Sequence, residues 1–363
     1  MRRLVLLLAL FSLLSLTVAN AQQSSPAPQL KPSEGDFTLH NFQFASGETL
    51  PELRMHYYTF GKLTKDATGR ATNAVLILHS TSGSGRQFLA PKFADVLFGP
   101  GQPLDINRYF VIIPDNIGHG KSSKPSDGTR THFPQYVYAD MVKAQHELLV
   151  EGLAVNHLRL ILGASMGCMH TFIWGETYPD FAAALMPLAC LPVEITGRNR
   201  MWREMIIEAI EKDPEWKNGD YTTQPQQALR TAGDMFLIAT GTPVILQKAG
   251  PTREQADQYL DDYVKRFAAA HDANDFLYAV RASRDYNPAP NLDKITAYVM
   301  FVNTADDFIN PPELGIAEQE IKKVKNGRFV LMPASGQTSG HGTHTDAAVW
   351  QSYLKQLLDE SQY

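Results

Sequence analysis

Short apolar runs recur along the chain without the polar alternation of a half-exposed strand. They are residues 74–78, 109–113, 158–162, 183–186 and 297–302. Strands that are covered on both faces of a sheet show this pattern, because neither face is in contact with water. The runs therefore predict the buried strands of a parallel sheet.

Helical stretches separate several of these runs. We expect one helix over about 136–152 and a second from Met166 to Tyr178, which Pro179 ends. Strands that alternate with helices imply a parallel sheet with crossover connections. Residues 36–61 alternate in polarity and predict a β-hairpin at the edge of that sheet.

The alternation of strands and helices stops between about 192 and 290. This region is rich in helix formers and charged residues and has few β-type runs. It therefore predicts a helical cap inserted into an α/β core that consists of residues 36–191 and 291–363. The core ends in a helix expected over about 346–358.

The N-terminus has the order of a secretory signal peptide. Met1-Arg2-Arg3 is followed by the apolar run 4–16 and by the small residues of Ala19-Asn20-Ala21. We expect a signal peptide over residues 1–21 with cleavage after Ala21, and a secreted or periplasmic protein. A retained anchor is the alternative, but the apolar run is shorter than the roughly 20 residues of a spanning helix. The polar stretch 22–35 is interpreted as a disordered mature N-terminus with no stable membrane insertion.

Charge and cysteine content exclude some classes of function. With 33 basic and 38 acidic residues the net charge is −5, and no basic stripe or tail indicates a nucleic-acid partner. Cys168 and Cys190 lack metal-ligand spacing. One disulfide between them is compatible with an oxidising compartment, but a pair of small buried thiols is the preferred interpretation. No metal or organic cofactor is implied.

A Gly-x-Ser-x-Gly motif lies between a predicted buried strand and a predicted helix. Gly163 and Gly167 flank Ser165 at positions where a side chain would clash within a tight strand-to-helix turn. The turn places the Ser165 hydroxyl at a helix N-terminus, where the N–H of Met166 can bind an oxyanion. The motif alone also arises by chance, but this placement favours a nucleophile.

A serine nucleophile needs a base and an acid to orient the base. In the α/β-hydrolase order both follow the serine. After the run ending at Val302 come Asp306 and Asp307, and Asp307 is preferred because a proline, Pro311, follows four residues later. Either aspartate could instead cap a helix.

The base is expected among the histidines of Gly340-His341-Gly342-Thr343-His344, which follow a further predicted strand over 328–332. His341 is preferred because glycines flank it, whereas His344 lies where the last helix begins. The second oxyanion donor is assigned to the backbone of Thr81, in the turn after the strand 74–78. His79 in that turn is interpreted as structural, and so is the loop 115–122.

With these residues placed, the chain resembles the homoserine O-acetyltransferase branch of the α/β-hydrolases over about residues 42–358. The resemblance rests on the following segments: 73–79, 140–145, the elbow 163–169, 176–180, and in the cap 208–221 and 267–277. It implies an α/β-hydrolase fold with a mostly parallel central sheet, flanking helices and a helical cap. It also implies a small-molecule acyl or ester substrate. Relatives often dimerise through the cap, and the sequence leaves the choice between a monomer and a homodimer open.

Several departures from the branch argue against the acetyltransferase activity. Its elbow reads Gly-Gly-Ser-Met-Gly-Gly-Met, whereas Ala164 and Cys168 stand here. Residues 232–243 lack the arginine and the Tyr-Arg pair that hold the substrate carboxylate in the branch. Gly-His-Gly-Thr-His replaces Gly-His-Asp, and an exported protein would not meet acetyl-CoA. We therefore expect an exported serine hydrolase, with an acyltransferase and a non-catalytic binding protein as alternatives.

Overall fold

An eight-stranded sheet forms the centre of the computed structural model, which describes residues 30–361. The chain divides into residues 1–30 and 31–363, and the sheet lies in the second unit. In spatial order its strands are β1 (Ser33–Gln43), β2 (Thr49–Phe60), β4 (Phe110–Pro114), β3 (Ala74–Leu78), β5 (Leu160–Ala164), β6 (Ala184–Leu188), β7 (Tyr298–Thr304) and β8 (Gly327–Met332). The predicted signal peptide lies outside the described residues.

The sheet is mostly parallel, as the apolar runs predict. From β4 through β3, β5, β6 and β7 to β8, neighbouring strands pair in parallel. The hairpin β1–β2 is antiparallel, and β2 pairs with β4 antiparallel. Every residue of β3, β5 and β6 is buried, which explains why these strands show no alternation. Strand β1 begins at Ser33, so residues 33–35 pair with β2 instead of belonging to a disordered terminus.

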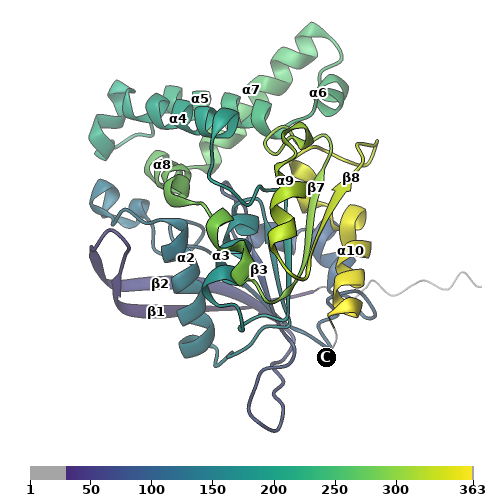
Figure 1. The fold of residues 1–363 in the computed structure, drawn as a ribbon. Helices are drawn as coiled ribbons and strands as arrows, with labels where there is room; N and C mark the ends of the chain where they lie inside the picture. The colour runs from purple at the N-terminus through teal and green to yellow at the C-terminus, as the bar shows by residue number, and fades with distance from the viewer. Residues whose placement is uncertain (1–29, 362–363) are drawn as a thin grey trace, which may run out of the picture. The chain divides into compact units, whose positions relative to one another are not determined.

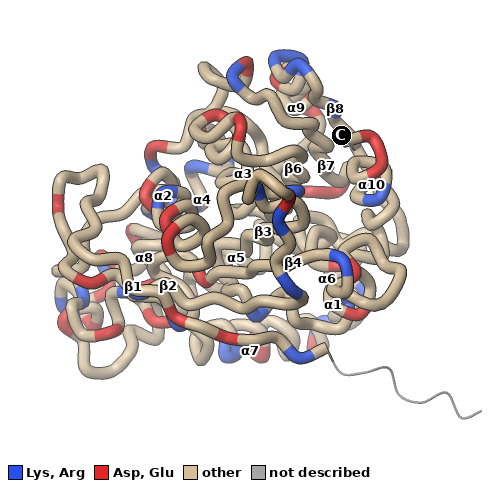
Figure 2. Tube along the Cα trace, turned by 90° about the horizontal axis from the view of Figure 1, so that it is seen from below, with Lys and Arg blue, Asp and Glu red and all other residues tan. Residues whose placement is uncertain are grey.

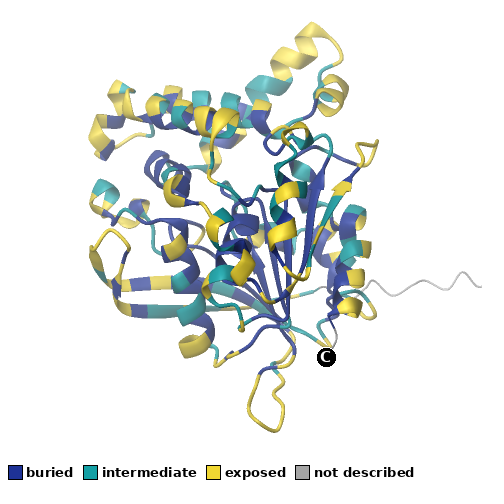
Figure 3. Ribbon diagram, viewed as in Figure 1, coloured by how far each residue is buried: buried dark blue, intermediate teal, exposed yellow. Residues whose placement is uncertain are grey.

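Helices flank the sheet (Figure 1). The described flanking helices are α1 (Pro91–Leu97), α2 (Tyr138–Glu147), α3 (Met166–Thr177), α9 (Ile316–Glu320) and α10 (Ala347–Glu360). Helix α2 packs against α3, and α10 packs against α1. The predicted helix over 136–152 ends as a π-helical turn, Leu148–Gly152. Figure 3 shows the sheet largely buried, while the helices also carry exposed residues.

The regular elements of the inserted segment are all helices. It contains α4 (Gly197–Glu211), α5 (Gln226–Thr240), α6 (Pro243–Ala249), α7 (Arg253–Ala270) and α8 (Ala273–Arg281). A small core of its own, which includes Ile206, Leu229 and Phe267, joins α4, α5, α7 and α8, while α6 contributes no buried residue to it. In Figure 1, α4 to α7 lie above one end of the sheet as a cap.

Charged residues of both signs are interspersed along the described trace (Figure 2). None of the helices between residues 30 and 361 combines the length and apolar character that crossing a bilayer requires. Within the same range, no cluster of His, Cys, Asp or Glu side chains has the arrangement of a metal site.

A disulfide links Cys168, in the first turn of α3, to Cys190, just after β6. The expectation of two buried thiols is therefore wrong. The two cysteines are separated by 22 residues in sequence, and spacing alone could not show that they meet. They meet because β5 and β6 are neighbours in the sheet, so the helix that follows β5 begins beside the end of β6.

Replacing both cysteines by alanine should destabilise the protein. Closing a loop over a separation of 22 residues reduces the entropy of the unfolded chain, and we expect a loss of about 3 kcal/mol in the free energy of unfolding. Urea unfolding without reductant measures the difference. As a control, reductant should lower the midpoint of the wild type and leave the variant unchanged. Two freely titratable thiols in the folded wild type would contradict the disulfide.

Candidate active site

The turn between β5 and α3 holds Ser165 in a backbone conformation that residues other than glycine rarely adopt. Its φ is 56° and its ψ is −109°. This conformation costs conformational energy for any residue other than glycine. The chain is crowded on both sides of this turn. A Cβ at Gly163 would lie 1.9 Å from the carbonyl oxygen of Gly167, and one at Gly167 would lie 2.1 Å from that of Leu78. Both flanking positions therefore require glycine.

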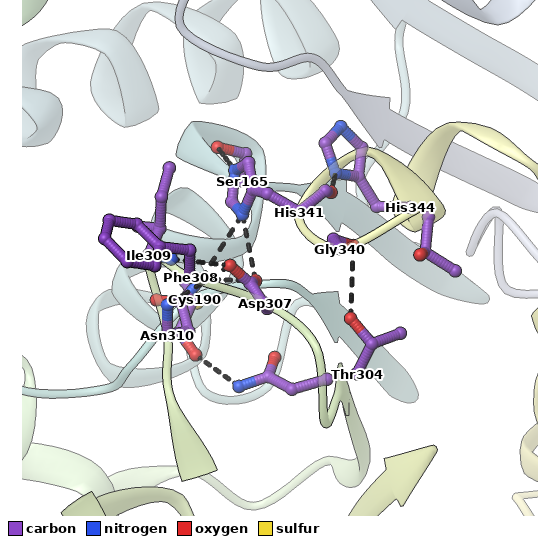
Figure 4. A network of polar contacts seen from close by, with 12 residues as sticks. Ser165, Cys190, Thr304, Asp307, Phe308, Ile309, Asn310, Gly340, His341 and His344 are labelled. Carbon is purple, nitrogen blue, oxygen red and sulfur yellow. Dashed lines mark hydrogen bonds and ion pairs between the residues drawn. The ribbon is translucent and has the colours of Figure 1, made fainter. Parts of the chain in front are cut away.

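The structure brings Ser165, His341 and Asp307 together (Figure 4). His341 Nε2 lies 2.8 Å from Ser165 Oγ, and His341 Nδ1 lies 2.9 Å from Asp307 Oδ2. The carboxylate can only accept, so Nδ1 carries the proton and Nε2 is left to accept the serine proton. All three side chains are buried. This is the arrangement that activates a serine hydroxyl as a nucleophile.

Asp307 is held as a carboxylate by its neighbours. Its Oδ1 accepts hydrogen bonds from the N–H groups of Ile309 and Asn310, at 2.8 and 3.2 Å, and its Oδ2 accepts one from Asn310 Nδ2 at 2.9 Å. Burial acts to raise the pKa of Asp307, but the charge of His341 and these hydrogen bonds outweigh it, and the pKa falls below its ordinary value. Sequence reasoning missed Asn310, because an asparagine before two prolines is also a common loop residue.

The two alternative residues lie beside the triad in supporting positions. Asp306 Oδ2 accepts hydrogen bonds from Thr338 Oγ1 at 2.8 Å and from the Gly340 N–H at 3.2 Å, and so fixes the loop that carries His341. His344 Nδ1 donates to the His341 carbonyl. Burial lowers the pKa of His344 to about 3. Within the described chain, neither residue hydrogen-bonds to Ser165.

Two backbone N–H groups are free to bind an oxyanion. Among residues 30–361, the N–H groups of Thr81 and Met166 donate no backbone hydrogen bond, and Met166 is the first residue of α3. The Gly167 N–H donates to the His79 carbonyl at 3.0 Å, which joins the Thr81 turn to the start of α3. Preorganised donors beside a nucleophile are the arrangement that stabilises a developing oxyanion.

Two pockets lie along the carboxyl edge of the sheet, one lined by segments on each side of β5. A pocket of about 590 Å³ is bounded by segments that follow β6 and β7, and its wall includes Met169, Leu191, Phe308 and Asp307. A pocket of about 290 Å³ is bounded by segments that follow β3 and β4 and by α8, and its wall includes Thr81, Lys124, His271 and Asp275. Because β5 lies between β3 and β6, Ser165 lies between the two pockets.

Several large aromatic and basic side chains of the cap do not line these two pockets: Trp202, Arg203, Trp216, Tyr259, Arg281 and Tyr286. Trp202, Arg203, Trp216 and Tyr286 are buried, and Arg281 pairs with Glu211. Their positions agree with packing roles. The cation at the larger pocket is instead Arg198, whose guanidinium lies 3.4 Å from the centre of the Phe308 ring.

Comparison with known proteins places the chain in a family. Residues 73–339 match the model of the alpha/beta hydrolase fold family. The chain belongs to this family, and the strained elbow and the mostly parallel sheet agree with this.

Within the family, the chain falls in the homoserine O-acetyltransferase-like branch. A homoserine O-acetyltransferase of Pelobacter propionicus is 31% identical over 354 residues, which cover 86% of this chain and 92% of that protein. One of Methanohalophilus mahii is 29% identical over 300 residues, 74% of this chain, and the chain spans only 60% of its length.

Solved structures share the fold at lower identity. The structure of esterase E22 has a TM-score of 0.79 at 21% identity and covers 90% of this chain and 100% of its own. A homoserine O-acetyltransferase from Bacillus anthracis also has a TM-score of 0.79, at 22% identity, and covers 90% of this chain and 98% of its own. The backbone fold therefore does not distinguish an esterase from an acetyltransferase.

The positions of the two aspartates predict different effects on Ser165. Asp307→Asn should slow labelling of Ser165 by a fluorophosphonate by about 10⁴-fold, because an amide at this position favours the wrong tautomer of His341. Asp306→Asn is the matched control and should slow it less than about tenfold, since Asp306 acts only on the loop. Labelling rates from intact-protein mass spectrometry measure both. Equal effects would contradict the assignment of Asp307.

Proposed function

We propose that the protein is an exported serine hydrolase that cleaves an ester-like acyl substrate through an acyl-enzyme on Ser165. The observation that carries the proposal is the hydrogen-bonded chain from Ser165 through His341 to Asp307. The comparisons support an enzyme of the hydrolase or acyltransferase kind.

In the first half-reaction Ser165 Oγ attacks the carbonyl carbon of the ester while His341 Nε2 takes the serine proton. Asp307 stabilises the imidazolium that forms. The N–H groups of Thr81 and Met166 hold the oxyanion of the tetrahedral intermediate. The bond from carbon to the leaving oxygen then breaks, and His341 gives its proton to that oxygen. The acyl group remains on Ser165.

In the second half-reaction water attacks the acyl carbon and gives a proton to His341. The bond to Ser165 Oγ breaks, and the serine recovers its proton from His341. An acid is released, and the site returns to its starting protonation.

The residues of the cap helix α5 favour hydrolysis over acyl transfer to homoserine. Residues 232–243 contain no arginine, and Arg230 at the start of the helix forms an ion pair with Asp261 near the surface. A substrate carboxylate bound against this segment would therefore find no arginine on α5, and a buried carboxylate requires a cationic partner. Arg198, the cation at the larger pocket, comes from α4 and is stacked on the Phe308 ring. The second candidate, an acyltransferase with the same acyl-enzyme, is supported by the 31% identity to a homoserine O-acetyltransferase.

Export is supported by two independent features. Residues 1–21 have the charge, apolar run and small residues of a signal peptide. The disulfide between Cys168 and Cys190 is a bond that forms and persists in oxidising compartments. A protein that reaches the periplasm or the outside of the cell would keep this link.

The mature protein should hydrolyse p-nitrophenyl acyl esters, and Ser165→Ala should lower the turnover by at least about three orders of magnitude. A graded series of acyl chains measures the specificity constant for each length. The chain length at which the constant is highest gives the size of the acyl group that the site accepts. Retained turnover in Ser165→Ala would overturn the role of this serine.

The same assay separates the candidate functions. Acylation of Ser165 that is released by an added alcohol or amine but not by water would favour an acyltransferase. Absence of turnover, together with no fluorophosphonate labelling of Ser165, would favour a binding protein on the same fold.

Expression of the full chain in a secreting bacterial host should give a mature protein that begins at Gln22. N-terminal peptide mass spectrometry of the periplasmic and extracellular fractions measures the cleavage site. Changing Ala21 to a bulky residue such as tyrosine should block processing, because the peptidase reads small residues at this position. An intact Met1 on folded protein in the cytoplasm would contradict export.

A further inference from the structure

The side chain of His79 makes two hydrogen bonds that define its protonation. It lies just after β3 and is fully buried. Its Nε2 accepts the backbone N–H of Asn116 at 3.0 Å, and its Nδ1 lies 2.9 Å from the Ser80 carbonyl oxygen. An N–H can only donate, so Nε2 is unprotonated and the ring proton is on Nδ1. His79 is therefore a neutral imidazole that donates to Ser80.

Burial acts in the same direction. It lowers the pKa of His79 well below the ordinary value, and the nearby His119 adds to this effect. The ring of His119 lies 5.0 Å from that of His79, and His119 Nε2 is 2.9 Å from the Thr81 carbonyl oxygen. His170 is the other titratable group that lowers this pKa. A second proton on His79 would place a buried charge against these groups and break the bond from Asn116.

The Ser80 carbonyl determines where the Thr81 N–H points. The two groups belong to one peptide unit, which is planar and trans, so they point in opposite directions. The Ser80 carbonyl oxygen also accepts the Gly83 N–H at 3.0 Å. Two donors thus hold this carbonyl, and rotation of the peptide plane would break both bonds. The free Thr81 N–H is fixed as a consequence.

The backbone of His79 reaches the other half of the site. Its carbonyl oxygen accepts the Gly167 N–H at 3.0 Å, and Gly167 directly follows Met166 in α3. One residue therefore orients the first donor through its ring and ties down the segment of the second donor through its carbonyl. No other described residue is hydrogen-bonded to both segments through its ring and its carbonyl in this way.

We infer that His79 is a positioning residue of the oxyanion hole. It fixes the direction of the Thr81 N–H through its hydrogen bond to the Ser80 carbonyl. This inference rests on the proposed function, because it assumes that an oxyanion forms beside Ser165. It assigns to His79 a role beyond packing. The role requires a donor at the position of Nδ1, while packing requires only a side chain of similar volume.

Two substitutions separate these requirements. His79→Asn keeps a donor close to the position of Nδ1, and His79→Gln, which is nearer in volume, keeps only a group close to the position of Nε2. We expect His79→Gln to lower kcat for ester hydrolysis roughly 10- to 100-fold with KM changed less than about threefold, because the oxyanion exists only in the transition state. His79→Asn should stay within about fivefold of the wild-type kcat. Equal losses, or a smaller loss in His79→Gln, would overturn the inference.

A measurement on the unmodified protein covers the case in which both variants misfold. Nitrogen-15 NMR of the histidine rings distinguishes the Nδ1–H tautomer from the Nε2–H tautomer and from the imidazolium. His79 should show the neutral Nδ1–H form from pH 5 to pH 8, and any other form would overturn the inference. The two failures remain distinguishable: if wild type does not hydrolyse esters, the proposed function fails. If it does and the variants or the tautomer disagree, only the role of His79 fails.

Discussion

The strained turn at Ser165 is the constraint on which the rest of the site depends. A serine at φ 56° is tolerated only where its surroundings hold it. Here, close backbone contacts at Gly163 and Gly167 do so, one within the turn and one against Leu78 of β3. The contact with β3 also explains the geometry of the oxyanion donors, because it places the first turn of α3 against the residues that follow that strand. Nucleophile and donors are thus parts of one packing arrangement.

Burial gives the site its electrostatic character. Several histidines surround it, and burial keeps the pKa values of His79, His119 and His344 below the ordinary value. Their rings therefore act as neutral hydrogen-bond partners. His341 differs from these three because a buried carboxylate, that of Asp307, faces its Nδ1. Neutral rings suit the reaction, since an imidazolium at one of these positions would compete with the charges that form during catalysis.

Much of this arrangement could be predicted from the sequence, and the exceptions share a physical cause. Apolar runs predict strands because burial on both faces selects consecutive apolar residues. The elbow can be recognised because steric crowding allows only glycine at two fixed positions. Asn310, the pairing of Cys168 with Cys190, and the bond from His79 to Ser80 depend on which loops and strands become neighbours in space. Short sequence patterns do not encode that proximity. The order of the strands in the sheet, with β5 between β3 and β6, determines which loops lie next to Ser165.

The disulfide has a consequence for durability. It closes a covalent ring that contains nearly all of α3 and the whole of β6, the crossover unit directly after the nucleophile. The cap begins only a few residues beyond Cys190. A single peptide-bond cut anywhere inside the ring would leave Ser165 attached to the cap and to the strands on both sides. In surroundings that contain proteases, the part of the chain that carries the nucleophile could be nicked without being lost.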